Sequence, residues 1–78
     1  MMRWKDAVRL AIVRHCRTTK SDVFSRKALI ERELAKIVSD TASKGSTPEQ
    51  TLSRILQELR EDGEIDFIDN DGTYCKLF

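Results

Sequence analysis

The stretch from Thr47 to Gly63 repeats its apolar residues at the spacing of a helix. Four positions follow the i, i+3, i+4, i+7 rule: Leu52, Ile55, Leu56 and Leu59. Because this spacing places the four side chains on one side of a helix, the pattern predicts an amphipathic helix that buries them in a small core.

Both ends of this helix are marked. Thr47 is positioned to cap free amide groups with its hydroxyl, Pro48 suits the first helical position, and Gln50 stands where a capping box has Glu or Gln. Gly63 follows the last apolar residue, where a left-handed cap favours a residue without a Cβ atom. The helix is therefore expected over about residues 47–62.

The side of this helix opposite the apolar stripe carries few charges in its first two turns. Four of its side chains are able to hydrogen-bond base edges: Gln50, Ser53, Arg54 and Gln57. Since Arg pairs with guanine and Gln with adenine in a major groove, this face favours the reading of double-stranded DNA. The alternative is a merely solvated face, but such faces are usually charged.

Two strand-like runs follow this helix. Residues 64–69 alternate, with Ile65 and Phe67 on one face, and residues 73–78 are able to return beside them. The turn between them is Asn70-Asp71-Gly72, whose residue types tolerate a positive φ. A hairpin is therefore predicted directly after the helix.

A first helix is predicted over about residues 2–16. Its core-facing positions are Trp4, Ala7, Val8, Ala11, Ile12 and His15. Leu10 and Val13 add apolar surface on another side, so the helix is expected to be largely buried.

A short strand and a second helix come next. Residues 22–24 are expected to add to the hairpin, and Ser25 then caps a helix that runs to about Val38. The apolar stripe predicted for this helix is Ile30, Leu34, Ile37 and Val38.

The order helix, strand, helix, helix, strand, strand predicts an α+β fold of the winged helix-turn-helix type, in which the hairpin is the wing. Residues 39–46 form a polar linker between the second and third helices. A chain of 78 residues forms one small core at most, so residues 1–78 are expected to be a single domain. The chain stops inside its last predicted strand, which suits the N-terminal part of a longer protein.

Charge is distributed unevenly along the sequence. Residues 1–60 hold 13 Lys or Arg against 7 Asp or Glu, and residues 61–78 hold 1 against 6. This separation favours an oriented electrostatic surface, with solubility as the alternative explanation. Arg26 and Lys27 at the start of the second helix, and Lys44 in the linker, are the predicted contacts to DNA phosphates.

The remaining composition excludes several classes. Cys16 and Cys75, without a secretory signal, are predicted to be reduced, and with His15 they supply too few ligands for a metal, so no metal or cofactor is expected. No Gly-rich phosphate loop, nucleophile elbow or zinc-hydrolase motif is present, which predicts a protein that is not an enzyme. No segment approaches the roughly 20 apolar residues that span a bilayer, so a cytoplasmic protein without a membrane partner is expected.

A family resemblance rests on three runs: TPEQTL at 47–52, LQELREDGEIDF at 56–67 and GTY at 72–74. They resemble the winged-helix domain at the C-terminus of DpnI-type and Dam-replacing restriction endonucleases. In that family the domain reads the DNA site, in some members sensing adenine methylation, while a separate domain cuts. The resemblance implies that the bases are faced by Gln50, Ser53, Arg54 and Gln57, and the phosphates by Thr47.

Two features depart from the family pattern. This chain holds no nuclease domain, and its predicted wing tip, Asp69-Asn70-Asp71, is acidic where a wing that touches DNA is ordinarily basic. A second function class therefore stays open: a protein-interaction module that uses the acidic hairpin or an apolar edge to join a catalytic domain or another partner protein.

Overall fold

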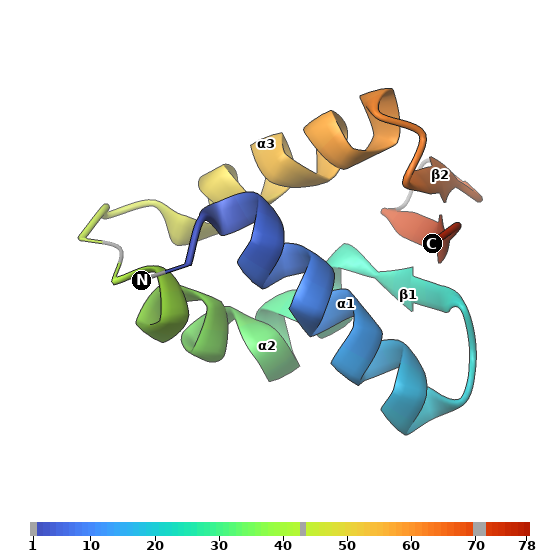
Figure 1. Cartoon of the computed structure of the whole chain (residues 1–78), viewed down its shortest axis with the longest axis horizontal. Coiled ribbons are helices and arrows are strands. Elements are labelled where there is room, and N and C mark those ends of the chain that lie inside the picture. Colours follow the sequence, from blue (N-terminus) through green and yellow to red (C-terminus); the bar gives the residue numbers. More distant parts are fainter. Residues whose placement is uncertain (1, 43, 70–71) are drawn as a thin grey trace.

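The computed structural model describes residues 2–42, 44–69 and 72–78, in which three helices pack with a three-stranded antiparallel sheet (Figure 1). The elements are α1 (Trp4–Thr19), β1 (Val23–Ser25), α2 (Arg26–Thr41), α3 (Pro48–Glu61), β2 (Ile65–Phe67) and β3 (Thr73–Lys76). The chain is therefore an α+β protein with the predicted order of elements.

Helix α3 packs against α1 and α2, and the sheet lies at the end of the helices where α3 stops (Figure 1). The predicted stripe is confirmed: Leu52, Leu56 and Leu59 are completely buried, and Ile55 is nearly so. Each such side chain contributes about 1.5–3 kcal/mol when it leaves water, so this stripe is what holds α3 in place.

The two ends of α3 differ in how well the sequence predicted them. Gly63 adopts a left-handed φ of 78°, its amide donates to the Arg60 carbonyl, and the Glu64 amide donates to the Leu59 carbonyl, which confirms the predicted glycine stop. The predicted cap by the Thr47 hydroxyl is wrong. Thr47 has φ −131° and ψ 62°, outside the extended conformation that aims a hydroxyl at the first helical amides.

Helix α1 runs three residues beyond the predicted end at Cys16. Its last turn closes on Lys20, which adopts a left-handed φ of 57°, and the Cys16 carbonyl accepts from the amides of Lys20 and Ser21. The expectation of a largely buried helix is wrong on one side, since Leu10 is 41% exposed.

Helix α2 begins as predicted, because the Ser25 hydroxyl accepts from the Ala28 amide at 3.0 Å. Its buried stripe is rotated from the predicted one and consists of Leu29, Glu33, Ile37 and Thr41. The Glu33 carboxylate is retained there because the Arg14 guanidinium of α1 donates to it at 2.6 and 2.9 Å. The predicted Ile30, Leu34 and Val38 are only half-buried.

The sheet has the order β1-β3-β2, so the early short strand joins the hairpin as predicted. Phe24 and Phe67 both pair with Tyr74 on the central strand. Gly72 ends the turn with a left-handed φ of 83°, as its residue type predicts. The predicted turn residues Asn70 and Asp71 lie outside the described residues.

The two cysteines are free thiols, as predicted: Cys16 is buried and Cys75 is half-buried. A bilayer-crossing helix is not found within residues 2–42, 44–69 and 72–78.

Candidate functional site

The outward side of α3 carries three of the four residues predicted to face bases. Gln50, Arg54 and Gln57 are exposed, while Ser53 is half-buried at the margin of this side. Arg54 leaves 68% of its side chain in solvent. The structure thus brings the four onto adjoining parts of one helix surface, and their contact with bases stays a prediction.

The polar side chains of this surface form only weak contacts with one another. Arg54 Nη1 lies 3.6 Å from Glu58 Oε2, and Gln57 Nε2 donates to Glu61 Oε1 at 3.4 Å. Both contacts join residues one turn apart on an exposed helix, where such pairs contribute only a few tenths of a kcal/mol. Arg54 and Gln57 are therefore free to exchange these contacts for those of a ligand.

Ser53 is different, because its hydroxyl already has two partners. Its oxygen accepts from Arg26 Nε at 2.6 Å, and its hydroxyl donates to the Glu49 carbonyl at 3.1 Å. A partner molecule would find one lone pair of this oxygen unused. Ser53 therefore joins α3 to the start of α2.

Arg26 connects three parts of the fold. Its side chain reaches Ser53 on α3, and its backbone amide donates to the Gly72 carbonyl at the end of the hairpin turn at 2.9 Å. Within the described part of the chain, neither Arg26 nor Lys27 forms an ion pair with a carboxylate. Arg26 therefore lies beside α3, and Lys27, the next residue of α2, is exposed.

An aromatic row ties the hairpin to α3, and sequence reasoning missed it. Phe24, Tyr74 and Phe67 stack across the three strands, with ring centroids 5.5 and 5.1 Å apart. The Arg60 guanidinium of α3 lies 3.8 Å from the Phe67 ring centroid, at the separation of a cation–π contact. Burial raises the pKa of Tyr74, although Arg26 and Arg60 act to lower it.

The alternating pattern of the hairpin placed Ile65 and Phe67 on one face. Which residues lie opposite them depends on the register of the strands, which the pattern does not give. The pairing of Phe24 with Tyr74 was not readable, because α2, α3 and β2 separate β1 from β3 and no local turn fixes their register. Arg60 lies at the side of α3 that faces this row. A helical projection alone does not predict this contact, because it does not say where the sheet packs against α3.

Two cations of α1 are paired with acids that follow α3. Lys5 Nζ lies 2.6 Å from Asp62 Oδ2, and Arg9 donates from Nε and Nη2 to both oxygens of Glu64 at 2.6 Å. These pairs bring the basic N-terminal part and the acidic C-terminal part together. The charge separation along the sequence is therefore partly cancelled in space.

The start of α3 lies beside a hollow of about 360 Å³ that Leu34, Pro48 and Gln50 help to line. Thr47, predicted to face phosphates, is exposed at its rim, and its carbonyl accepts from the Thr51 amide at 3.2 Å. Lys44 is exposed in the preceding linker.

No group of three or more His, Cys, Asp or Glu able to hold a metal ion occurs among the residues that the structure describes. In comparisons with known proteins, no family model, curated protein or solved structure matches this chain.

Proposed function

We propose that this chain is a winged helix-turn-helix module that binds double-stranded DNA with α3 in the major groove. The observation that carries the proposal is the outward side of α3, where Gln50, Arg54 and Gln57 are exposed above a fully buried leucine stripe. A rigidly seated helix with neutral hydrogen-bonding groups and one guanidinium suits the reading of base edges.

The flanks of α3 supply the backbone contacts in this proposal. Arg26 and Lys27 reach phosphates on one side of the groove, and Thr47 and Lys44 do so at the start of α3. Phosphate contacts of this kind set the position of the helix, while base contacts set the sequence.

The hairpin acts as a wing that supports α3 rather than one that enters a groove. Asp66 and Asp69 would be repelled by phosphates, whereas the Arg60–Phe67 contact fixes the hairpin against α3. These roles of α3 and the hairpin are compatible with a cytoplasmic transcription regulator or with the targeting module of a restriction–modification protein. They assign no catalysis to the chain.

A DNA-binding measurement with Arg54→Ala tests this proposal. Arg54 contributes no atom to the core, so the variant keeps its fold and loses about 1–3 kcal/mol of affinity for a duplex selected from a randomised pool. Fluorescence anisotropy between about 50 and about 200 mM salt gives the affinity and its salt slope.

Arg32→Ala is the matched control. Arg32 is also exposed, but it lies two positions from Leu34, which places it on the side of α2 away from the start of α3. The two variants have the same net charge, so equal losses of affinity would contradict a specific role for Arg54, and no salt-dependent binding by the unmodified protein would contradict the proposed function.

A second function has one observation in its favour. The hairpin exposes Phe67 and Ile68, the latter at 52%, beside Asp66. Apolar side chains next to acids suit a partner protein with a basic, apolar surface better than they suit DNA. Ile68→Ser would weaken that association and leave DNA affinity unchanged.

A further inference from the structure

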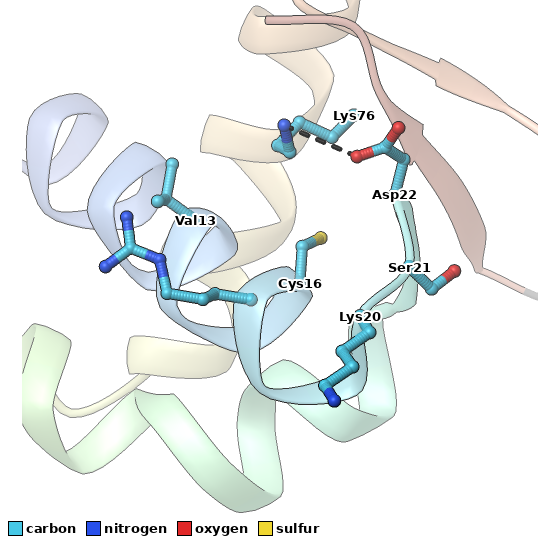
Figure 2. A pocket seen from close by; sticks show the side chains of 7 residues that line it. Val13, Cys16, Lys20, Ser21, Asp22 and Lys76 are labelled. Carbon is cyan, nitrogen blue, oxygen red and sulfur yellow. Dashed lines mark ion pairs between the residues drawn. The ribbon is translucent and has the colours of Figure 1, made fainter.

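A second hollow, of about 330 Å³, opens at the end of α1 (Figure 2). Its walls come from the last turns of α1, the turn that leads to β1, and the end of β3. Lys76 and Lys20 stand on opposite sides of Cys16 in Figure 2, and Arg17 completes the set of cations around the hollow. Segments distant in sequence therefore gather three basic side chains around one opening.

The charge of this hollow is positive. Asp22 is its one acid among the lining residues, and it lies 3.4 Å from Lys76 Nζ, which leaves Arg17 and Lys20 without an ion pair in the described part of the chain. Three cations and one carboxylate give a local charge of +2 (3 − 1). An anion that enters meets an uncompensated field from more than one side.

The partial charge at the end of α1, about half an elementary negative charge, is smaller than the local charge of +2. The Cys16 carbonyl is occupied by the amides of Lys20 and Ser21, and the Arg14 carbonyl accepts from the Thr18 hydroxyl. The last carbonyls of the helix are thus partly covered by donors.

Lys20 occupies a backbone conformation that its residue type disfavours. Its φ of 57° lies in the left-handed region, where a residue with a Cβ atom is less stable by roughly 1–2 kcal/mol than in the right-handed one. Glycine would suit this position better for folding alone. A lysine there is consistent with a role for its ammonium group beside the hollow.

Cys16 lines the hollow as a neutral group. Only 5% of the residue is exposed, and burial raises the pKa of its thiol, against the smaller lowering by Lys76. A neutral thiol does not repel an anion as a thiolate would. The Ser21 hydroxyl accepts from the Val23 amide and keeps its own proton for donation to a ligand.

We propose that this hollow binds a small anion that carries a phosphate group, held by Arg17, Lys20 and Lys76. A phosphate monoester has a charge of about −1.5 to −2 at neutral pH and three acceptor oxygens, which matches the local charge and the spread of the cations. A planar carboxylate, with two oxygens, meets fewer of these donors. The volume lies near the lower limit of ligand pockets, roughly 300 Å³, so the ligand is small.

The hollow is separate from the surface of α3. None of its lining residues belongs to α3, and the end of α1 and α3 lie on opposite sides of the view in Figure 1. The proposal therefore stands or fails independently of DNA binding.

A titration of the isotope-labelled protein with inorganic phosphate tests the site, with sodium chloride at equal ionic strength as the control. We expect saturable amide shifts at Cys16, Lys20 and Ser21 with phosphate and none with chloride. Shifts that grow linearly without saturation, or equally in both salts, would overturn the proposal.

Lys20→Gly separates the ligand from the fold. Because glycine suits the left-handed position, this variant melts no lower than the unmodified protein, while its dissociation constant for phosphate rises about two- to fivefold through the loss of one exposed cation. Saturable binding is lost when Arg17→Gln is added.

Two controls separate the two changes made by Lys20→Gly, the change of backbone and the loss of a charge. Ala42→Gly makes the same backbone change at the left-handed end of α2 without removing a charge, and Lys36→Gln removes an exposed charge from α2, away from the hollow. Both keep the phosphate affinity of the unmodified protein. An equal loss in Lys36→Gln, or shifts of the same three amides by a short DNA duplex, would overturn the assignment to a small anion.

Discussion

At the scale of single residues, a polar contact between Ser53 and Arg26 gives Ser53 a different role from the one predicted from its position on the helix. Both were predicted from sequence to meet DNA, one at a base and the other at a phosphate. The structure joins them to each other at 2.6 Å, between α3 and the start of α2. We infer that Ser53 is a positioning residue that orients the Arg26 guanidinium beside α3.

This role predicts an energetic coupling between the two residues. Ser53→Ala removes the acceptor of a half-buried charged donor, so the free energy of unfolding should fall by about 1 kcal/mol in the unmodified background. In an Arg26→Ala background the same change should have no effect. Denaturant unfolding of the four proteins measures the coupling free energy directly.

The same four proteins report on DNA. If Ser53 acts through Arg26, Ser53→Ala weakens DNA binding only while Arg26 is present. If Ser53→Ala instead lowers the DNA affinity as much in the Arg26→Ala background as in the unmodified protein, Ser53 contacts the DNA itself.

The sequence predicted which side chains of α3 are exposed better than it predicted which residues they contact. The exposure of Gln50, Arg54 and Gln57 follows from helical geometry, because the buried stripe fixes the opposite side. The Arg26–Ser53 and Arg60–Phe67 contacts join separate elements, and their partners depend on packing that no local pattern encodes.

At the scale of elements, strong local signals were predictive and weak ones were not. Gly63 and Ser25 mark helix ends correctly, since a left-handed glycine and a serine cap act within a few residues. The end of α1 was placed too early, because no glycine stands there and Lys20 takes the left-handed position instead. The buried Glu33 was missed, although its four-residue spacing from Leu29 and Ile37 places it on their side.

The pairs that join α1 to the residues after α3 predict a pH dependence of stability. The Arg9 hydrogen bonds hold the pKa of Glu64 below its ordinary value. A carboxylate with a lowered pKa in the folded state adds stability above its unfolded pKa, near 4.3, and loses that contribution as the pH falls through the folded pKa. The unmodified protein should therefore lose stability in acid faster than Glu64→Gln does.

Denaturant unfolding from about pH 7 to about pH 3 measures this difference. The gap between the two proteins should be constant near neutrality and close in acid. Glu31→Gln, at an exposed carboxylate of α2 without an ion pair in the described residues, should show no comparable gap. A gap for Glu64→Gln that stays constant into acid would contradict the role of the pair.

At the scale of the whole molecule, ion pairing changes what the sequence charge predicts. The acidic end of the chain folds back on α1, where Asp62 and Glu64 neutralise Lys5 and Arg9. DNA binding through α3 is therefore expected to depend on a small set of phosphate contacts, those of Arg26, Lys27, Lys44 and Thr47. The order of elements was predictable because each has its own signal, whereas this redistribution of charge required the relative placement of α1 and the hairpin.

DNA binding through α3 is tested most directly by a titration of amide chemical shifts with a short duplex at low and moderate salt. We expect salt-sensitive shifts at α3 and the start of α2, at Gln50, Ser53, Arg54, Gln57, Arg26 and Lys27. Shifts confined to the hairpin, or an unmoved α3 at both salt concentrations, would contradict it.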